Sequence, residues 1–190
     1  SAVAKSKLRG LGVEVRENML VSRIERGYVE AAGWTIPTHT VVWAAGMRAS
    51  PLLKTLNTPL DRMGRALVEP DCSIPGHPEV FVIGDAAHFE DPAHGSLPGV
   101  AQTAIQMGKY VAHVIVGDLR GKPRTPFKYF DKGQLAVIGR GQAVAEIWKL
   151  KFSGFIAWFI WAFIHIAFLI GFRNRVLVML QWAWSYFNYE

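Results

Sequence analysis

Short hydrophobic runs separated by polar turns fill most of the chain, and longer apolar runs follow only near its C-terminal end. Residues 28–30 and 34–37 flank a glycine-containing turn and predict two strands. Residues 5–12 have the character of a short helix that ends at glycine, and residues 13–15 predict a strand after it. The apolar, β-branched run at 40–46 predicts a further strand that ends in small residues.

The most informative pattern lies in the middle of the chain. Residues 80–83 form a continuous β-branched and aromatic run that is followed by Gly84 and Asp85. Such a run predicts a buried parallel strand that delivers a carboxylate to its C-terminal edge, where open α/β sheets bind ligands. A polar loop is expected at 88–96, and residues 98–116 then predict a helix that begins at a proline.

The remaining segments complete a mixed pattern. Residues 47–60 carry two prolines and predict a crossover between domains, and residues 64–70 predict a short strand. A loop is expected at 72–78. Residues 134–139 and 142–147 are two strand-like runs separated by a short turn. Strands that alternate with helices in this way are typical of α/β proteins.

The C-terminal end differs because its apolar runs are longer. Residues 152–172 carry no charge over about 21 positions, a length that can cross a bilayer core. A basic Arg-Asn-Arg turn at 173–175 interrupts the run, and residues 176–189 resume it over about 14 positions, which is too short to span. Two such helices predict a membrane-dipping hairpin, one transmembrane span or a helix pair on the membrane surface. The alternative is a helix pair buried in a core or a dimer.

Composition narrows the class of partner. The 190-residue chain has a formal net charge of +6, and five of its seven Trp and seven of its eleven Phe lie at or after Trp148. A basic end whose aromatic residues lie in an uncharged run fits an anionic membrane surface better than nucleic acid. Cys72 is the single cysteine, which excludes an intrachain disulfide and a cysteine zinc set. The histidines show no convincing metal-ligand spacing, so no metal is expected.

Polar groups around the central pattern are candidates for chemistry. Asp85 presents a carboxylate that accepts hydrogen bonds from ligand hydroxyls, although Gly-Asp pairs also form ordinary turns. The helix that follows begins with N–H groups that have no partner within the helix, and this end carries partial positive charge. Gln102 and Gln106 are four residues apart, so both amides project from one helix face. They either donate hydrogen bonds to ligand carbonyl oxygens or lie on a solvated face.

Gly84 and Asp85, together with the helix sequence Ala-Gln-x-Ala-x-Gln at 101–106, resemble the second flavin-binding element of two-dinucleotide-domain flavoproteins. The Gly-Phe-Arg-Asn-Arg sequence at 171–175 narrows the resemblance to the type II, non-proton-pumping NADH:quinone dehydrogenases. This resemblance implies an α/β fold: the C-terminal part of a two-Rossmann-domain (FAD/NAD(P)-binding) flavoprotein with a C-terminal helical membrane-anchoring segment. The implied domains are the end of the NADH-binding domain at 1–46, the C-terminal part of the FAD-binding domain at 47–147 and membrane-anchoring helices at 148–190.

The resemblance also implies the ligands and the residues that would hold them. FAD, NADH and a quinone substrate are expected, with Gly84 and Asp85 at the flavin ribityl chain. Gln102 and Gln106 would act as the catalytic pair between flavin and quinone. Lys132 is a weaker candidate for the quinone pocket, because a surface lysine in a hairpin turn fits its sequence equally well. Further close approaches to the flavin or the nicotinamide are expected at Gly46, which ends a Trp-x-x-Gly segment, and at Val100, Ala101, Gln102 and Ile105.

By the same resemblance, the expected activity is electron transfer from NADH through FAD to a membrane quinone without proton pumping. The chain holds no Gly-x-Gly-x-x-Gly sequence, so the pyrophosphate-binding residues are expected before Ser1, and we interpret the chain as a C-terminal fragment. The expected partners are membrane lipid, quinone and NADH, with no nucleic acid, and a homodimer stays open. The expected location is peripheral, on the cytoplasmic face of a bacterial inner membrane, or a single transmembrane span. The alternatives are another reductase of the superfamily, such as sulfide:quinone or ferredoxin reductase, and a non-catalytic membrane-attached remnant.

Overall fold

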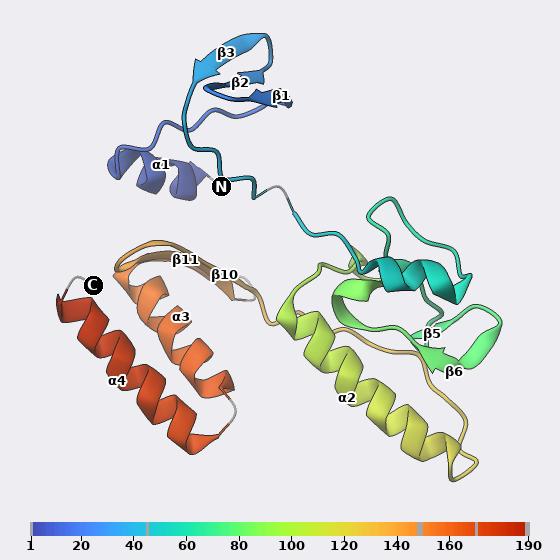
Figure 1. Ribbon diagram of the computed structural model, residues 1–190. Coiled ribbons are helices and arrows are strands. Elements are labelled where there is room, and N and C mark those ends of the chain that lie inside the picture. Colours follow the sequence, from blue (N-terminus) through green and yellow to red (C-terminus); the bar gives the residue numbers. More distant parts are fainter. Residues whose placement is uncertain (1, 45, 148–149, 170, 189–190) are drawn as a thin grey trace. The chain divides into compact units, whose positions relative to one another are not determined.

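The computed structural model describes residues 2–44, 46–147, 150–169 and 171–188. The chain forms two compact units (Figure 1). The terminal unit contains Ser1–Val41 and Asp131–Glu190, and the central unit contains Val42–Phe130. The domain boundaries predicted after residues 46 and 147 divide a longer protein by the cofactor that each domain binds. The two compact units do not test these boundaries, which stay predictions.

The N-terminal part of the terminal unit is a helix followed by a small antiparallel sheet. Helix α1 spans Ala2–Gly10, and the strands β1 (Val21–Glu25), β2 (Tyr28–Ala31) and β3 (Trp34–Pro37) pair in the order β1-β2-β3. The sequence predicted the helix and the last two strands. The first strand escaped prediction because its polar side chains hide the alternation that marks a strand.

Two predicted strands are not formed in this part of the chain. Residues 13–15 form no strand, and neither do residues 40–44 and 46, the described part of the strand predicted at 40–46; Ala45 lies outside the described residues. A buried strand needs neighbours whose backbone groups complete its hydrogen bonds, and among the described residues no strand pairs with either segment. Val42 is accordingly 85% exposed.

The C-terminal part of the terminal unit is an antiparallel sheet that packs on a helix. Strands β10 (Gln134–Gly139), β11 (Gln142–Ile147) and β12 (Leu150–Gly154) pair in that order, and helix α3 (Phe155–Phe168) lies against them. The buried centre consists of Ala143, Ala145 and Ala157. The sequence predicted β10 and β11. It missed β12, which contains the first residues of the uncharged run, so α3 begins only at Phe155.

Helix α4 (Phe172–Asn188) lies beside α3 and contacts it through aromatic rings (Figure 1). Trp161 of α3 stacks on Trp182 of α4, with ring centroids 5.2 Å apart and planes 3° apart. The guanidinium carbon of Arg140 lies 4.4 Å from the ring centroid of Tyr186 and so connects the sheet to α4. Stacked aromatic rings therefore hold this helical hairpin together.

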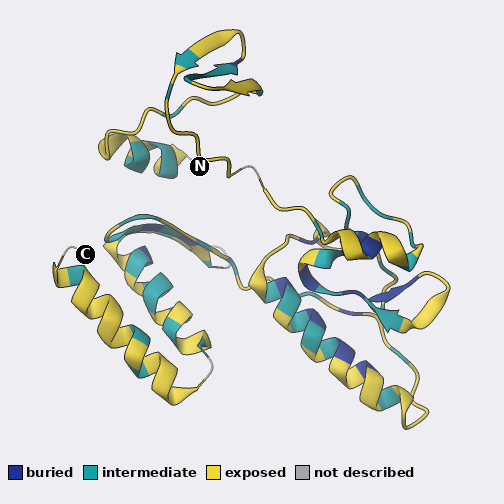
Figure 2. Cartoon of the chain, viewed as in Figure 1, coloured by how far each residue is buried: buried dark blue, intermediate teal, exposed yellow. Residues whose placement is uncertain are grey.

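Most of α4 and part of α3 are exposed (Figure 2), and many of the exposed residues are large and apolar. Phe163 is 66% exposed and Phe187 is 80% exposed. The formally charged side chains of the two helices are Arg173 and Arg175, at the start of α4. Among the described residues, no helix combines the length and the apolar character needed to cross a membrane.

The central unit consists of short strand pairs arranged around one long helix, α2 (Ala101–Asp118). The sequence predicted this helix and the short strand within residues 64–70. The pairs are β4 (Ala66–Leu67) with β7 (Ala87–His88) in parallel, and, antiparallel, β5 (Ser73–Ile74) with β6 (His77–Phe81) and β8 (Glu90–Asp91) with β9 (Gly95–Ser96). Two 3₁₀ helices complete the unit, η1 (Pro51–Leu56) and η2 (Gly84–Ala86).

Two sequence predictions for this unit were wrong. Residues 80–83 were expected in a parallel strand, but β6 ends at Phe81 and pairs antiparallel with β5. The segment 72–78 was expected as a loop, but Gly76 adopts a φ of +79°, which allows a tight turn, and so the segment joins β5 to β6 as a hairpin. The polar segment 88–96 similarly contains the β8–β9 hairpin.

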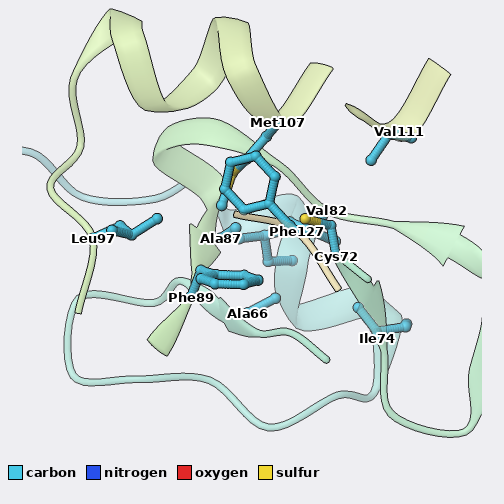
Figure 3. Close-up of a cluster of buried hydrophobic side chains, with 11 residues drawn as sticks. Ala66, Cys72, Ile74, Val82, Ala87, Phe89, Leu97, Met107, Val111 and Phe127 are labelled. Atoms are coloured by element: carbon cyan, nitrogen blue, oxygen red, sulfur yellow. The ribbon is translucent and has the colours of Figure 1, made fainter. Parts of the chain in front are cut away.

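One hydrophobic cluster holds the central unit together, and its members come from strands, turns and α2 alike (Figure 3). Ala66 and Cys72 are fully buried, and Met107 of α2 is almost so. Phe89 meets Phe127 edge to face, with ring centroids 5.3 Å apart. Because the strands are short, side-chain packing rather than a continuous sheet fixes the positions of the loops in this unit.

After α2 the chain turns and runs back along the helix as an irregular segment, residues 122–130, which we call the return segment (Figure 1). Its start is fixed by Arg124, whose Nη1 donates to Oδ2 of Asp71 at 2.8 Å. Its middle is fixed by Phe127, which is buried and whose N–H donates to the carbonyl oxygen of Pro70 at 2.7 Å. Specific contacts thus replace regular secondary structure here.

Candidate functional site

Gly84 begins the tight turn η2, which follows β6 along the chain and packs against α2. Its φ is +63°, and a Cβ built on it would lie 2.9 Å from the Cβ of Ala104. Its N–H donates to the sulfur of Met107 at 3.2 Å. Only glycine suits this backbone conformation and this close approach, so Gly84 lets α2 pack directly on the turn.

Asp85 follows in η2 and is exposed, although the run before it is buried or half-buried. A Cβ built on Gly99 would lie 3.3 Å from Oδ1 of Asp85 and 3.6 Å from Cε of Met47. The fold therefore brings the Asp85 carboxylate to the loop that leads into α2. An exposed carboxylate in this position can accept hydrogen bonds from ligand hydroxyls.

The N-terminus of α2 supplies donor groups. Its N-cap is Val100, which makes no side-chain capping hydrogen bond and has no side-chain oxygen with which to make one. The first turn holds no acidic residue, and Val100, Ala101 and Ile105 are exposed. The helix end thus presents backbone N–H groups and partial positive charge, which favour an anionic or electron-rich ligand.

Gln102 and Gln106 lie on one face of α2, but the structure engages them differently. The side-chain oxygen of Gln102, in the first turn, is buried. The amide of Gln106 pairs with the backbone of Phe130: Nε2 donates to the Phe130 carbonyl oxygen and Oε1 accepts from the Phe130 N–H, each at 3.0 Å. The sequence offers no signal for this pairing, because the two residues are 24 positions apart and no pattern connects them.

The residues at this turn fit a flavin. Asp85 can accept from the hydroxyls of a ribityl chain, and the start of α2 can stabilise negative charge at the pyrimidine edge of a reduced flavin ring. Gly84 and Gly99 let the turn and the start of α2 lie close together, because a Cβ at either position would meet neighbouring atoms of the protein. The sequence prediction for Gly84, Asp85 and the first turn of α2 therefore describes residues that the fold brings together.

Two other predicted residues are less informative. Gly46 lies in an irregular stretch with a φ of +104°, and its neighbour Met47 reaches Gly99. Lys132 belongs to the terminal unit, where its Nζ lies 5.7 Å from the centroid of the Phe168 ring. Within the described ranges, no group of three or more His, Cys, Asp or Glu side chains has the geometry to hold a metal ion.

A charged network beside β4 and β7 was not singled out from the sequence. Asp61 accepts from Nε of Arg65 at 2.7 Å and from the backbone N–H groups of Met63 and Arg65 at 2.8 Å each. Burial raises the pKa of Asp61, but these hydrogen bonds together outweigh burial and lower the pKa to about 2. Nη2 of Arg65 also lies 2.8 Å from Nδ1 of His88 in β7, so the network braces the segment that follows Asp85.

A mixed α/β fold in which an exposed aspartate and an uncapped helix start flank a glycine turn is typical of the dinucleotide-binding oxidoreductases. Within this class, the chain belongs to the pyridine nucleotide-disulphide oxidoreductase family, whose sequence profile matches residues 1–108. A second profile, described as the NDH2 C-terminal domain, matches residues 132–188.

Curated relatives confirm the predicted resemblance to the type II NADH dehydrogenases. The chain is 42% identical over 97% of its length to the type II NADH:quinone oxidoreductase Ndh of Mycobacterium tuberculosis, of which it covers 42%. It is 32% identical over 80% of its length to the type II NADH:quinone oxidoreductase of Staphylococcus saprophyticus, of which it covers 39%. The chain thus spans about two fifths of the length of these relatives.

Solved structures support the fold. NDH2 from Plasmodium falciparum, determined in complex with NADH, matches with a TM-score of 0.80 at 15% identity, over 97% of this chain and 54% of that one. An NAD-dependent persulfide reductase from A. fulgidus matches with a TM-score of 0.59 at 18% identity, over 76% of this chain and 27% of that one. At these identities the likeness establishes the fold.

Proposed function

We propose that this chain is the flavin- and quinone-binding part of a type II NADH:quinone oxidoreductase, which passes electrons from NADH through FAD to a membrane quinone without pumping protons. The observation that carries the proposal is the exposed Asp85 carboxylate beside the uncapped start of α2. The 42% identical relative named for this activity supports it. In this proposal residues 1–46 end the NADH-binding domain, 47–147 belong to the FAD-binding domain and 148–190 attach the enzyme to the membrane.

Residues of the Gly84 turn and of the start of α2 would bind different parts of the cofactor. Asp85 would accept hydrogen bonds from the ribityl hydroxyls, and Gly84 would keep α2 close enough for its first turn to reach the ring. Backbone N–H groups at Val100 and Ala101 would stabilise negative charge on the reduced ring, which favours hydride acceptance. Bound FAD would supply the redox chemistry itself, by accepting a hydride from NADH and giving two electrons to the quinone.

The quinone would meet the face of α2 that carries Gln102 and Gln106. A neutral amide can donate to a quinone carbonyl oxygen without introducing a fixed charge. Gln102 is in the first helical turn, which is also the turn proposed to face the flavin, and Gln106 follows one turn later. This placement supports a quinone site next to the flavin ring, with Gln102 as the amide nearest to both.

The α3–α4 hairpin is the surface proposed to attach the enzyme to the membrane. Its outward side chains are large and apolar, and Arg173 and Arg175 add positive charge at the turn. The sequence from 147 to 189 contains no acidic residue. An apolar face beside positive charge favours the surface of an anionic bilayer, so we propose peripheral attachment, on the cytoplasmic face of a bacterial inner membrane. The alternative is that this apolar face of the α3–α4 hairpin binds a second copy of the chain in a homodimer.

Cys72 is poorly suited to the thiol chemistry that a cysteine-dependent reductase of the same family would require. Its side chain is fully buried in the central cluster. Burial and the nearby Asp71 raise the pKa of the Cys72 thiol to about 12, so the reactive thiolate is scarce at neutral pH.

The test is flavin content and half-reaction kinetics in the flavin-loaded enzyme that contains this chain. Asp85→Ala should lose FAD, whereas Glu69→Ala, which removes an exposed carboxylate elsewhere in the central unit, should keep it. Gln102→Ala should slow the oxidation of reduced flavin by quinone more than the reduction of flavin by NADH. Stoichiometric FAD in Asp85→Ala, or equal slowing of both half-reactions in Gln102→Ala, would refute the corresponding assignment.

A further inference from the structure

The face of α2 that carries the two glutamines also carries Tyr110. Gln102, Gln106 and Tyr110 follow one another at intervals of four residues, so they form a row along the helix with a rise of about 6 Å between members. The hydroxyl of Tyr110 donates to the carbonyl oxygen of Thr125 in the return segment. Gln106 binds both backbone groups of Phe130 at the end of the same segment. Gln106 and Tyr110 therefore both form hydrogen bonds with the return segment.

The direction of the return segment determines where these hydrogen bonds place its last residue, Phe130. The segment runs antiparallel to α2, and it meets Tyr110 first and Gln106 second. It therefore approaches the N-terminal end of α2 as it reaches Phe130. Phe130 is held opposite Gln106, one helical turn from Gln102, at the point where the chain leaves the central unit.

The Gln106–Phe130 pair uses the amide at both ends. One N–H of Nε2 donates to the Phe130 carbonyl oxygen, and Oε1 accepts from the Phe130 N–H, which is the geometry of two strands that exchange hydrogen bonds. The backbone of Phe130 lies in an irregular segment, where side chains must satisfy groups that a sheet would otherwise pair. Glutamine is suited to this task because its side chain reproduces the donor and acceptor of a peptide group.

We propose that Gln106 is a positioning residue, which acts on quinone reduction by fixing the end of the return segment at Phe130, while Gln102 faces the substrate. The inference rests on the proposed function for its effect on quinone, and on the two Gln106–Phe130 hydrogen bonds for the contact itself. Tyr110 supports the same segment from the next position of the row. Loosening the segment at either residue changes the position of Phe130 relative to Gln102.

The test compares three variants of the flavin-loaded enzyme that contains this chain. Gln106→Met keeps the length of the side chain and removes both hydrogen bonds, and Tyr110→Phe removes only the hydroxyl. Lys109→Met, at an exposed position of α2, is the matched control. The measurements are hydrogen exchange in peptides that cover residues 122–130, the KM for quinone and the rate of flavin reduction by NADH.

Gln106→Met should speed exchange at residues 127–130 by roughly tenfold, since both hydrogen bonds that fix Phe130 to α2 are lost. The KM for quinone should rise in Gln106→Met and, to a smaller extent, in Tyr110→Phe, with flavin reduction by NADH unchanged. The double variant should show less than the product of the two single effects, because both act through one segment. Lys109→Met should leave all three measurements unchanged.

Two outcomes would overturn the inference. The first is a raised KM in Gln106→Met with unchanged exchange at 127–130 and no effect of Tyr110→Phe, which would make Gln106 a direct ligand of the quinone. The second is faster exchange with unchanged kinetics in both variants, which would make the contact structural only. Failure of the proposed function is distinct from both: the unsubstituted enzyme would not reduce quinone at all, while the exchange measurement would still report on the contact.

Discussion

The central and terminal units hold their shape in opposite ways. The central unit has little regular structure apart from α2, yet its loops converge on one large buried cluster, and Arg124, Tyr110 and Gln106 fix the return segment. The C-terminal part of the terminal unit consists almost entirely of regular elements, but its buried centre is three alanines and its large side chains point outward.

This difference shows where each unit is sensitive to change. In the central unit the candidate site depends on the close approach of α2 to the Gly84 turn and on side-chain hydrogen bonds. A single substitution at Gly84 or Gln106 is therefore expected to change the geometry of the site. In the terminal unit, Trp161 and Trp182 stack between α3 and α4, whereas outward rings such as Phe159 and Phe163 are largely exposed. Their apolar surface is available for a partner, and the proposed partner is the membrane.

The largest expected effect is that of Gly84→Ala, which tests whether close packing maintains the central unit. A Cβ at Gly84 would overlap that of Ala104 in a backbone conformation that costs non-glycine residues energy. We expect a loss of about 3 kcal/mol in the free energy of unfolding, together with loss of flavin. Urea unfolding and the flavin-to-protein ratio measure the two effects.

Ala104→Gly in the same chain separates the two causes. The double variant removes the steric overlap but keeps the positive φ at residue 84 and adds the cost of glycine within a helix, about 1 kcal/mol. Partial recovery of flavin is therefore expected without full recovery of stability. If Gly84→Ala alone unfolds like the unsubstituted protein and retains flavin, the close approach of α2 to the turn is not required.

The next effect concerns the terminal unit. Phe163, which is 66% exposed on α3, is expected to enter the membrane, so Phe163→Ser should weaken binding to anionic vesicles by roughly tenfold or more while changing stability little. Co-sedimentation with vesicles of phosphatidylglycerol and phosphatidylcholine measures binding, and urea unfolding measures stability. The matched control is Leu119→Ser, which removes an exposed apolar side chain from the central unit and should leave vesicle binding unchanged.

A smaller effect tests the charged network of the central unit by pH. Because the pKa of Asp61 is lowered to about 2 in the folded state, its ionised form stabilises the fold above about pH 4, and this stabilisation is lost as the pH falls toward 2. Asp61→Asn should therefore cost about 1 kcal/mol at neutral pH and little near pH 2. Denaturant titrations at several pH values measure the difference, and a constant difference between the two proteins would contradict the assignment.

The same contrast explains which features the sequence could predict. Regular elements with local signals were predicted well: β2, β3, β10 and β11 follow from β-branched runs between turns. Helix α2 was predicted from the proline at 98, although it begins three residues later, at Ala101. The strands predicted at 13–15 and 40–46 are not formed by the described residues of these ranges, because a strand also requires a partner, which a local pattern does not reveal. The prediction of a parallel strand at 80–83 was wrong for a similar reason, since an apolar run looks the same in a parallel and in an antiparallel pairing.

The candidate site divides along the same line. Gly84, Asp85 and the first turn of α2 were predicted, because each carries a local signal in residue type and spacing. The approach of Gly99 to Asp85 and the pairing of Gln106 with Phe130 each involve an irregular segment, and no periodicity encodes such contacts. The Asp61 network escaped for the same reason, since its members Arg65 and His88 are separated along the chain by 23 residues.

The smallest expected effect is a reaction that should be slow. Cys72 is fully buried in the central cluster and its pKa is raised to about 12, chiefly by burial, so a thiol reagent such as dithionitrobenzoate should label it slowly in the folded protein and quickly in urea. If the central unit is as closely packed as its cluster indicates, Gly84→Ala should raise the native labelling rate, whereas Phe163→Ser should not. Rapid labelling of the unsubstituted protein would show that the central unit opens readily, and the contrast between the two units would then no longer hold.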